Sequence, residues 1–329
     1  MGKNAITYIY IMKELIDYLK NNDIKFEENI SLRKKTWIKT GGIVAVWIEP
    51  NTTDELTRLS RYFFEKKLNY EVVGHTSNVF YLDTTNPSII VSTKRLTSYQ
   101  LLDSCVSCDC GVHVSTLSRS LVKKGFKGFS GLVNLPGTVG AATVNNSSCF
   151  NSQISSLIKD VTLFDKSTGK IKTINVEELK YSHRSSTLKR KEIDAVVISV
   201  RLNVIQGNIT EEIQKAEKAT EIRKLTQEPP AYTLGSVFAN LKERNNMGFR
   251  IFRRFYNILA VMHIVGSISR TRLLLKYYGY DKLHPYVSDK NVNTFIWKPE
   301  IKDKSYLFSE YCRFMAKAFV NPHLEIEVR

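Results

Sequence analysis

The sequence predicts a folded protein in which helices and strands alternate along two or three domains. Its 329 residues exceed what one hydrophobic core usually organises. Hydrophobic residues make up 43% of the chain and charged residues 24%, close to the averages for globular proteins. The spacing of apolar residues changes several times between the helical and the strand period, which indicates that both element types are present.

The first segment predicts a helix followed by a β-α-β pattern. Residues 6–20 have helix-like apolar spacing and predict a helix that packs on the body of the protein. Residues 44–48 and 70–73 are typical of strands. Between them, the capping-box sequence from Thr52 to Glu55 predicts a helix that runs to about Lys67.

The second segment, residues 85–207, predicts strands at 88–92 and 195–202 and a helix at 114–124. A polar helix at 210–225 follows, and Pro229 and Pro230 prevent its continuation. We therefore expect domain boundaries near residues 84 and 207, with segments 1–84, 85–207 and 208–329.

The last segment predicts a strand at 294–297, a helix at 304–319 and a final strand. In that strand Leu324, Ile326 and Val328 alternate with Glu325 and Glu327. The alternation predicts that both glutamates lie on the face opposite the apolar residues.

Targeting signals and metal-site patterns are weak in this chain. No apolar run reaches the 18 or more residues of a membrane span, and the N-terminus lacks a signal-peptide pattern, so we expect a cytoplasmic protein. Cys105, Cys108 and Cys110 lie in segment 101–114, which is typical of a strand. Since no second cysteine cluster follows, we expect small buried residues there and no metal site.

A net charge of +16 predicts an anionic partner. Nucleic acid, an anionic membrane and phosphorylated small molecules all fit this charge. No zinc-finger, RNP or helix-turn-helix pattern is present, so we do not expect nucleic-acid binding.

Two glycine-containing loops have the character of anion-binding loops. Gly74 to Asn78 follows a predicted strand, where backbone N–H groups and small polar side chains could hold a pyrophosphate. In the loop Gly131 to Ala142, Pro136 stiffens the backbone, Gly137 and Gly140 permit close approach, and Thr138 offers a hydroxyl. Taken alone, the first loop is better explained as an ordinary turn after a strand, whereas the second is about equally compatible with a packed loop and with a ligand-binding loop.

Two further segments complete the set. His183 to Ser186 places Arg184 in a polar loop beside Tyr181, where a solvated charge is the simpler interpretation. Gly235 to Phe238 places Ser236 after a glycine without the GxSxG pattern of a hydrolase nucleophile.

Taken in order, these four segments resemble the UDP-N-acetylenolpyruvoylglucosamine reductase family over residues 28–329. The same order includes Thr36, Thr40 to Gly42, Asn146, Arg223 to Gln227, Val287 to Lys290 with Phe295, and the C-terminal Glu327-Val328-Arg329. Only 52 positions (236 − 184) separate Arg184 from Ser236, which resembles the shorter type II members. The chain departs from the family pattern at glycine positions occupied by His75, Thr76, Ala141, Ser148 and Asn151, and also at His183, Ala239 and Leu241.

The resemblance implies an α+β fold: a two-subdomain FAD-binding fold of the PCMH/VAO type with a C-terminal α+β substrate domain. It implies FAD and NADPH as cofactors and reduction of UDP-N-acetylglucosamine enolpyruvate to UDP-N-acetylmuramate. The FAD-binding residues implied are Gly74, Ser77, Asn78, Leu135, Pro136, Gly137, Thr138, Gly140 and Asn146. Arg184 would stabilise the negative charge that hydride addition builds on the substrate, and Ser236 would donate the proton. Glu327 would orient or polarise the substrate, with Glu325 as the alternative.

Two other functions stay open: a flavin reductase that acts on another nucleotide sugar in surface-polysaccharide synthesis, and a non-catalytic flavin-fold binding protein. Residues 247–280 depart most from the family. Between Lys242 and Lys290, ten Lys or Arg residues face three Asp or Glu, a balance of +7. We expect residues 249–280 to form an amphipathic surface helix or helix pair that contacts an anionic membrane or another biosynthetic protein; a solvated helix with one buried face is the alternative. The oligomeric state is left undetermined.

Overall fold

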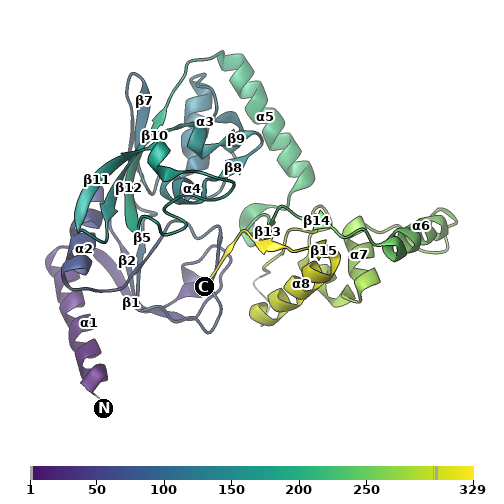
Figure 1. The fold of residues 1–329 in the computed structure, drawn as a ribbon, viewed down its shortest axis with the longest axis horizontal. Helices are drawn as coiled ribbons and strands as arrows, with labels where there is room; N and C mark the ends of the chain where they lie inside the picture. The colour runs from purple at the N-terminus through teal and green to yellow at the C-terminus, as the bar shows by residue number, and fades with distance from the viewer. Residues whose placement is uncertain (1–2, 299, 301–302) are drawn as a thin grey trace. The chain divides into compact units, whose positions relative to one another are not determined.

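A computed structural model describes residues 3–298, 300 and 303–329 (Figure 1). The chain divides into two compact units. Unit 1 comprises residues up to 31, 43–75 and 86–217, and unit 2 comprises 32–42, 76–85 and 218–329. Unit 2 thus takes two short stretches from the first predicted segment, and the three-part division of the sequence stays a prediction.

Unit 1 contains a four-stranded mixed sheet with the order β1-β2-β5-β3. Its strands are β1 (Lys25–Ser31), β2 (Ile43–Glu49), β3 (Glu71–Val73) and β5 (Ile89–Ser92). β1 pairs antiparallel with β2, whereas β5 pairs parallel with both β2 and β3. All four residues of β5 are buried, as expected for a central parallel strand that is covered on both faces.

Two helices belong to this first part of unit 1, α1 (Lys3–Asn21) and α2 (Thr53–Glu65), and both confirm the sequence prediction. α2 begins where Thr52 accepts a hydrogen bond from the Glu55 N–H at 3.1 Å. The Glu55 carboxylate accepts the Asn51 N–H at 2.8 Å instead of that of Thr52, so the capping box is not reciprocal in the usual way. Leu56, Leu59 and Phe63 are buried on one face of the helix.

The second sheet of unit 1 is five-stranded and antiparallel, with the order β11-β10-β12-β7-β6 (Figure 1). Its strands are β6 (Tyr99–Leu101), β7 (Cys105–Asp109), β10 (Ile158–Asp165), β11 (Lys170–Asn175) and β12 (Ala195–Asn203). Also in unit 1 are α3 (Val114–Lys123), α4 (Val139–Asn145), β8 (Ser148–Cys149), β9 (Ser152–Gln153) and the 3-10 helices η2 (Ser130–Leu132), η3 (Ile154–Ser156) and η4 (Val176–Leu179). Apolar residues of both sheets and of α2 and α3 form one continuous core.

Unit 2 has its own core and is built mainly from helices. It contains α6 (Met247–Val261), α7 (Arg270–Tyr278), α8 (Lys304–Ala318) and the 3-10 helices η1 (Leu32–Lys34), η5 (Pro230–Tyr232) and η6 (Asp281–Tyr286). Its strands are short: β4 (Val79–Phe80), β13 (Phe238–Ala239), β14 (Lys242–Glu243), β15 (Phe319–Val320), β16 (His323–Leu324) and β17 (Glu327–Val328). The unit boundary falls within α5 (Ile209–Thr226). Aromatic rings dominate this core: Phe295 lies 4.6 Å from Trp297 and 5.2 Å from Tyr311 between ring centroids.

Three sequence predictions are wrong in detail. Segment 101–114 is not one strand, because a turn separates β6 from β7 and α3 begins at Val114. Residues 294–297 form only isolated bridges, of Phe295 with Val287 and of Ile296 with Thr233, since their partners are loops and not strands. The final strand is split into β16 and β17, which pair with β13 and β4 respectively, so no single sheet imposes two faces. Leu324 and Val328 are consequently exposed, while Ile326 is buried.

The cysteines lie where the sequence predicted, in small buried positions: Cys105, Cys108 and Cys110 are all buried. The Cys108 thiol donates to the Val200 carbonyl at 3.2 Å. Burial raises the pKa of the Cys108 and Cys110 thiols to about 12, so both are neutral and unreactive at physiological pH. None of the described helices combines the length and apolarity needed to cross a bilayer.

Candidate active site

The first glycine loop ends β3 and packs closely against the second. A Cβ atom at Gly74 would lie 2.4 Å from the Thr138 Oγ1 atom, so only glycine fits there without a shift of Thr138. Thr138 is itself buried and begins α4, accepting the Ala141 N–H at 3.3 Å. Unit 1 therefore holds residues 74 and 138, which were predicted independently, in direct contact.

The backbone N–H groups of the second loop fall into two kinds, those used within the protein and those left for a ligand. The N–H groups of Val139 and Gly140 donate to the Val112 and Cys110 carbonyls at 2.8 Å each, so they cannot serve a ligand. Gly140 acts instead by close packing, because a Cβ there would lie 2.8 Å from the Cys110 Cβ. Within the part of the chain that the structure describes, the N–H groups of Gly137 and Thr138 donate to no other group. Gly137 has φ +107°, a conformation that glycine adopts readily.

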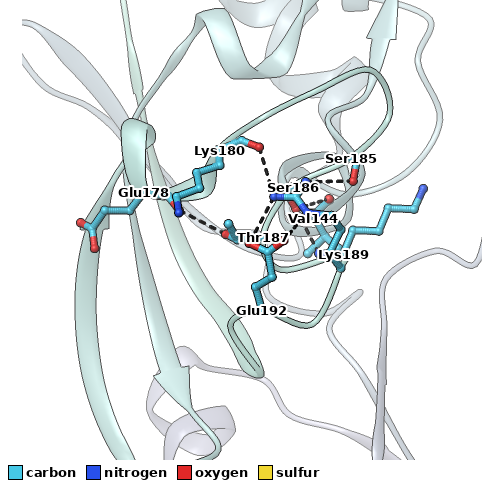
Figure 2. Close-up of polar contacts among 9 residues, drawn as sticks. Val144, Glu178, Lys180, Ser185, Ser186, Thr187, Lys189 and Glu192 are labelled. Carbon is cyan, nitrogen blue, oxygen red and sulfur yellow. Dashed lines mark hydrogen bonds and ion pairs between the residues drawn. The ribbon is translucent and has the colours of Figure 1, made fainter.

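The loop that contains Arg184 is fastened to the C-terminal end of α4. The last carbonyls of a helix lack partners within the helix. Here the Tyr181 hydroxyl donates to the Thr143 carbonyl at 2.9 Å. The Ser186 hydroxyl donates to the Val144 carbonyl at 2.6 Å (Figure 2). A third bond runs in the other direction, from the end of α4 to the arginine loop, because the Asn146 Nδ2 atom donates to the Ser182 carbonyl at 2.8 Å. These bonds join the glycine loop and the arginine loop into one rigid assembly.

Arg184 itself has a left-handed backbone with φ +54°. Such a conformation in a residue other than glycine costs about 1 to 3 kcal/mol, and it clusters at functional sites. The Lys189 Nζ atom donates to the Arg184 carbonyl at 3.1 Å and so helps to hold this turn. The sequence did not indicate a role for Lys189, because its contact depends on a turn that brings its side chain back to the backbone five positions earlier.

One buried acceptor in unit 1 fits a cofactor. Asn146 is buried at the end of α4, with φ +47°, and its Oδ1 atom has no hydrogen-bond partner among the described residues. A buried acceptor without a donor is costly unless a ligand or water supplies one. A ligand that carries both N–H or O–H groups and an anionic group has complementary partners among these residues. The Asn146 Oδ1 atom can accept from its N–H or O–H groups, and the free Gly137 and Thr138 N–H groups can donate to its anionic group. The residues present therefore fit FAD.

His75 and His113 form a pair of rings that sequence reasoning missed. Their centroids lie 3.8 Å apart, and the two residues come from the loop after β3 and the turn before α3. Burial, followed by the nearby His113 and Lys94, lowers the pKa of His75 to about 4, so His75 is neutral at physiological pH. Nothing in the sequence links positions 75 and 113, which only the fold brings together.

Unit 2 gathers the other predicted residues around its C-terminal strand segment. The Glu327 N–H donates to the Asn78 carbonyl at 2.9 Å, and β17 pairs parallel with β4 directly after the first glycine loop. The Glu325 N–H donates to the Val237 carbonyl at 2.8 Å. One strand segment thus contacts both the Ser77–Asn78 end of the first loop and the segment that contains Ser236. The Glu327 carboxylate forms an ion pair with Arg329.

Ser236 directly precedes two residues that Asn293 holds in place. Asn293, which sequence reasoning also missed, accepts the Val237 N–H at 2.9 Å through its backbone carbonyl. Through its side chain Asn293 accepts the Phe238 N–H at 2.9 Å and donates to the Phe238 carbonyl at 2.8 Å. The partly exposed Ser236 hydroxyl makes no hydrogen bond within the described residues, and the space at Gly235, which has φ +75°, is open. The hydroxyl is therefore available to a ligand.

Two departures from the family glycines keep the glycine conformation. Thr76 has φ +54° and Asn151 has φ +63°, both left-handed. Thr76 is buried, and its hydroxyl accepts the Trp37 N–H at 2.8 Å, which offsets part of the strain.

Comparison with known proteins agrees with this geometry. The FAD binding domain family model matches residues 44–175. The reductase of Caldicellulosiruptor bescii is 28% identical over 224 residues, 67% of this chain and 70% of the relative. The UDP-N-acetylenolpyruvoylglucosamine reductase of Prochlorococcus marinus strain NATL2A is 30% identical over 272 residues, which cover 78% of this chain and 92% of the relative. The chain belongs to the UDP-N-acetylenolpyruvoylglucosamine reductase family.

The fold agrees with this family. The crystal structure of UDP-N-acetylenolpyruvylglucosamine reductase from Thermus caldophilus superposes with a TM-score of 0.65 at 20% identity, covering 93% of this chain and 98% of the other. The predicted α+β fold with two FAD-binding subdomains is confirmed. In this reductase-family protein, unit 1 contains Gly74, the second glycine loop, Asn146 and Arg184, and unit 2 contains Ser77, Asn78, Ser236 and Glu327.

Proposed function

We propose that this chain catalyses the FAD-dependent, NADPH-using reduction of UDP-N-acetylglucosamine enolpyruvate to UDP-N-acetylmuramate, a precursor of cell-wall peptidoglycan. FAD, when bound, would supply the hydride that it takes from NADPH. Gly74, Ser77, Asn78, the loop from Leu135 to Gly140 and Asn146 would hold it without a covalent bond. The protein's own residues must then bind the substrate, stabilise charge and deliver a proton.

Arg184 is assigned to the substrate carboxylate. Hydride addition to the enolpyruvyl double bond builds negative charge on the carbon next to this carboxylate and on its oxygens, which a fixed guanidinium stabilises. The bonds from Tyr181 and Ser186 to α4, and from Lys189 to Arg184, fix the arginine loop before the substrate arrives. A fixed cation needs no reorganisation when the charge forms.

Ser236 is assigned as the proton donor. A serine hydroxyl is a weak acid in water, so it can protonate only a strongly basic carbon that forms directly beside it. Asn293 fixes both residues that follow Ser236, and the hydroxyl is not used within the described chain. Glu327 is assigned to orient or polarise the reacting group from the neighbouring strand, with Arg329 holding its carboxylate.

The contact of one C-terminal strand segment with both Asn78 and Val237 carries this proposal, because it joins the cofactor loop to the serine segment. The proposal includes a cytoplasmic location, where NADPH is available, and a UDP-linked sugar as substrate, with no role for nucleic acid.

The visible absorption spectrum tests the cofactor assignment. Purified protein reconstituted with FAD should retain flavin absorbance after desalting and lose it on denaturation, because the bond is non-covalent. Protein that stays colourless would refute the enzymatic assignment. Protein that binds FAD but oxidises NADPH only with a different nucleotide sugar would refute the substrate assignment alone.

A further inference from the structure

Helix α6 exposes a continuous apolar stripe. Met247, Ile251, Phe255, Ile258 and Met262 follow one another at spacings of four, four, three and four residues, which places them on one face of the helix. Val261, at the end of α6, and Ile264, just beyond it, are exposed apolar residues as well. These side chains are 52% to 79% exposed, from Ile258 to Val261. Isolated exposed apolar residues are common, but a stripe of this length marks an interaction surface.

The opposite face of α6 packs against α7, the helix next to it (Figure 1). Phe249 is buried, and the ring centroids of Phe249 and Phe252 lie 5.4 and 5.5 Å from that of Tyr277 on α7. Asn246 caps the helix by accepting the Phe249 N–H at 3.0 Å, and its Oδ1 atom also accepts the Tyr277 hydroxyl at 3.1 Å. The face with Phe249 and Phe252 packs α6 on the rest of unit 2, so the exposed stripe on the other face is not needed to hold the helix.

The charges around the stripe have one sign. Residues 244–280 contain six Arg and one Lys and no Asp or Glu. Arg250 and Arg254 are exposed one turn apart on α6, and the helical period places both along the same edge of the stripe. A second copy of the same face would bring like charges together and is disfavoured. An anionic partner is complementary.

A lipid surface fits these features better than a folded protein. An apolar stripe on a convex helix, with basic residues beside it, is the pattern of helices that lie in the membrane interface. A bilayer accepts such a helix without matching its shape, and anionic head groups attract juxtamembrane Lys and Arg. We propose that α6 docks unit 2 on an anionic bilayer, with its stripe at the acyl-chain boundary and Arg250 and Arg254 against lipid phosphates.

The test is flotation of the full-length protein with vesicles. Vesicles of equal parts phosphatidylglycerol and phosphatidylcholine should bind the protein at about 0.05 M salt. Vesicles of phosphatidylcholine alone should bind it much less, and about 0.5 M salt should weaken binding because exposed charges are screened. Each apolar side chain lost from the stripe should lower partitioning by about tenfold. The double variant Ile251→Asp/Phe255→Asp should therefore fall by about a hundredfold.

A matched control carries the same new charges elsewhere. Ile205 and Leu225 are 65% and 71% exposed outside α6, so Ile205→Asp/Leu225→Asp should bind vesicles almost as the unaltered protein does. Absence of flotation with the anionic vesicles, or equal loss in both double variants, would overturn the proposal; the stripe would then serve an acidic protein or none.

A second measurement does not depend on the charged variants. Ile258→Trp should be quenched by lipids brominated on their acyl chains if the stripe enters the bilayer. Unchanged fluorescence in vesicles that bind the protein would exclude insertion of α6.

Discussion

Replacing Gly74 by Ala tests the contact between the two glycine loops. The new Cβ would lie 2.4 Å from the Thr138 Oγ1 atom and 3.1 Å from its Cγ2 atom, and Thr138 is buried at the start of α4. Such overpacking costs about 1 to 3 kcal/mol. The lower entropy of the unfolded chain returns about 0.4 to 1 kcal/mol, because the backbone at Gly74 is not left-handed. We expect a net loss of about 1.3 kcal/mol in the free energy of unfolding from the middle of the two ranges, and of about 2.6 kcal/mol at most.

The same change should weaken FAD binding. Moving Thr138 also moves the N–H groups of Gly137 and Thr138, the two donors that the loop offers. Loss of one good hydrogen bond, about 1.4 kcal/mol, corresponds to about a tenfold higher Kd for FAD. Urea denaturation of the FAD-free protein and fluorescence titration with FAD measure the two effects separately.

The control and the partner variant make this prediction specific. A Cβ at Gly266 would meet nothing within 4 Å, so Gly266→Ala should leave the Kd for FAD unchanged and should raise the free energy of unfolding by about 0.4 to 1 kcal/mol, through the unfolded chain alone. Thr138→Ala removes the Oγ1 atom and should cost about 1 kcal/mol as a lost N-cap. Gly74→Ala should then add little in the Thr138→Ala background. Additive losses in the double variant would show that the two loops do not touch as described.

Three further predictions concern the other candidate residues. Ser236→Ala should leave the bleaching of flavin absorbance by NADPH near normal but slow its recovery with the enolpyruvyl substrate by about two to four orders of magnitude, as stopped-flow absorbance can measure; equal slowing of both steps would indicate a structural role. Ser186→Ala removes the buried hydroxyl that donates to the partly buried Val144 carbonyl, so the free energy of unfolding should fall by about 0.5 to 1.5 kcal/mol. The value of kcat should fall through disorder of the Arg184 loop, and a stable variant with normal kcat would contradict the anchoring role. His75 has a pKa of about 4 in the folded protein and about 6.5 in the unfolded chain, so between these values the folded protein binds fewer protons and the free energy of unfolding should fall as pH falls. His75→Gln should flatten this part of a plot of the free energy of unfolding against pH. An unchanged slope would refute the assignment.

The sequence predicted the elements whose signals are local. The Thr52 cap fixed the start of α2, and apolar spacing located α3, α8 and the strands β2, β3, β5 and β12 to within a few residues. The remaining strands of unit 1, among them β1, β10 and β11, were not predicted. The four motif segments were found because each needs glycine or a small polar residue at a defined place in a turn. The left-handed Thr76 shows why the family uses glycine at that position.

The failures and omissions share one cause, which is dependence on distant partners. Alternation from Leu324 to Val328 predicts two faces only if a single sheet receives the strand, and here its two halves pair with different strands. Asn293 supports the Ser236 segment from 57 positions away (293 − 236), and His113 meets His75 across 38 (113 − 75). No local pattern records such contacts.

The most direct test of the proposed reaction is the mass of the product. Protein reconstituted with FAD, given NADPH and UDP-N-acetylglucosamine enolpyruvate, should yield a nucleotide sugar heavier by two hydrogens, with one NADPH oxidised for each molecule formed. Recovery of the substrate at unchanged mass, with FAD bound and NADPH present, would contradict the account.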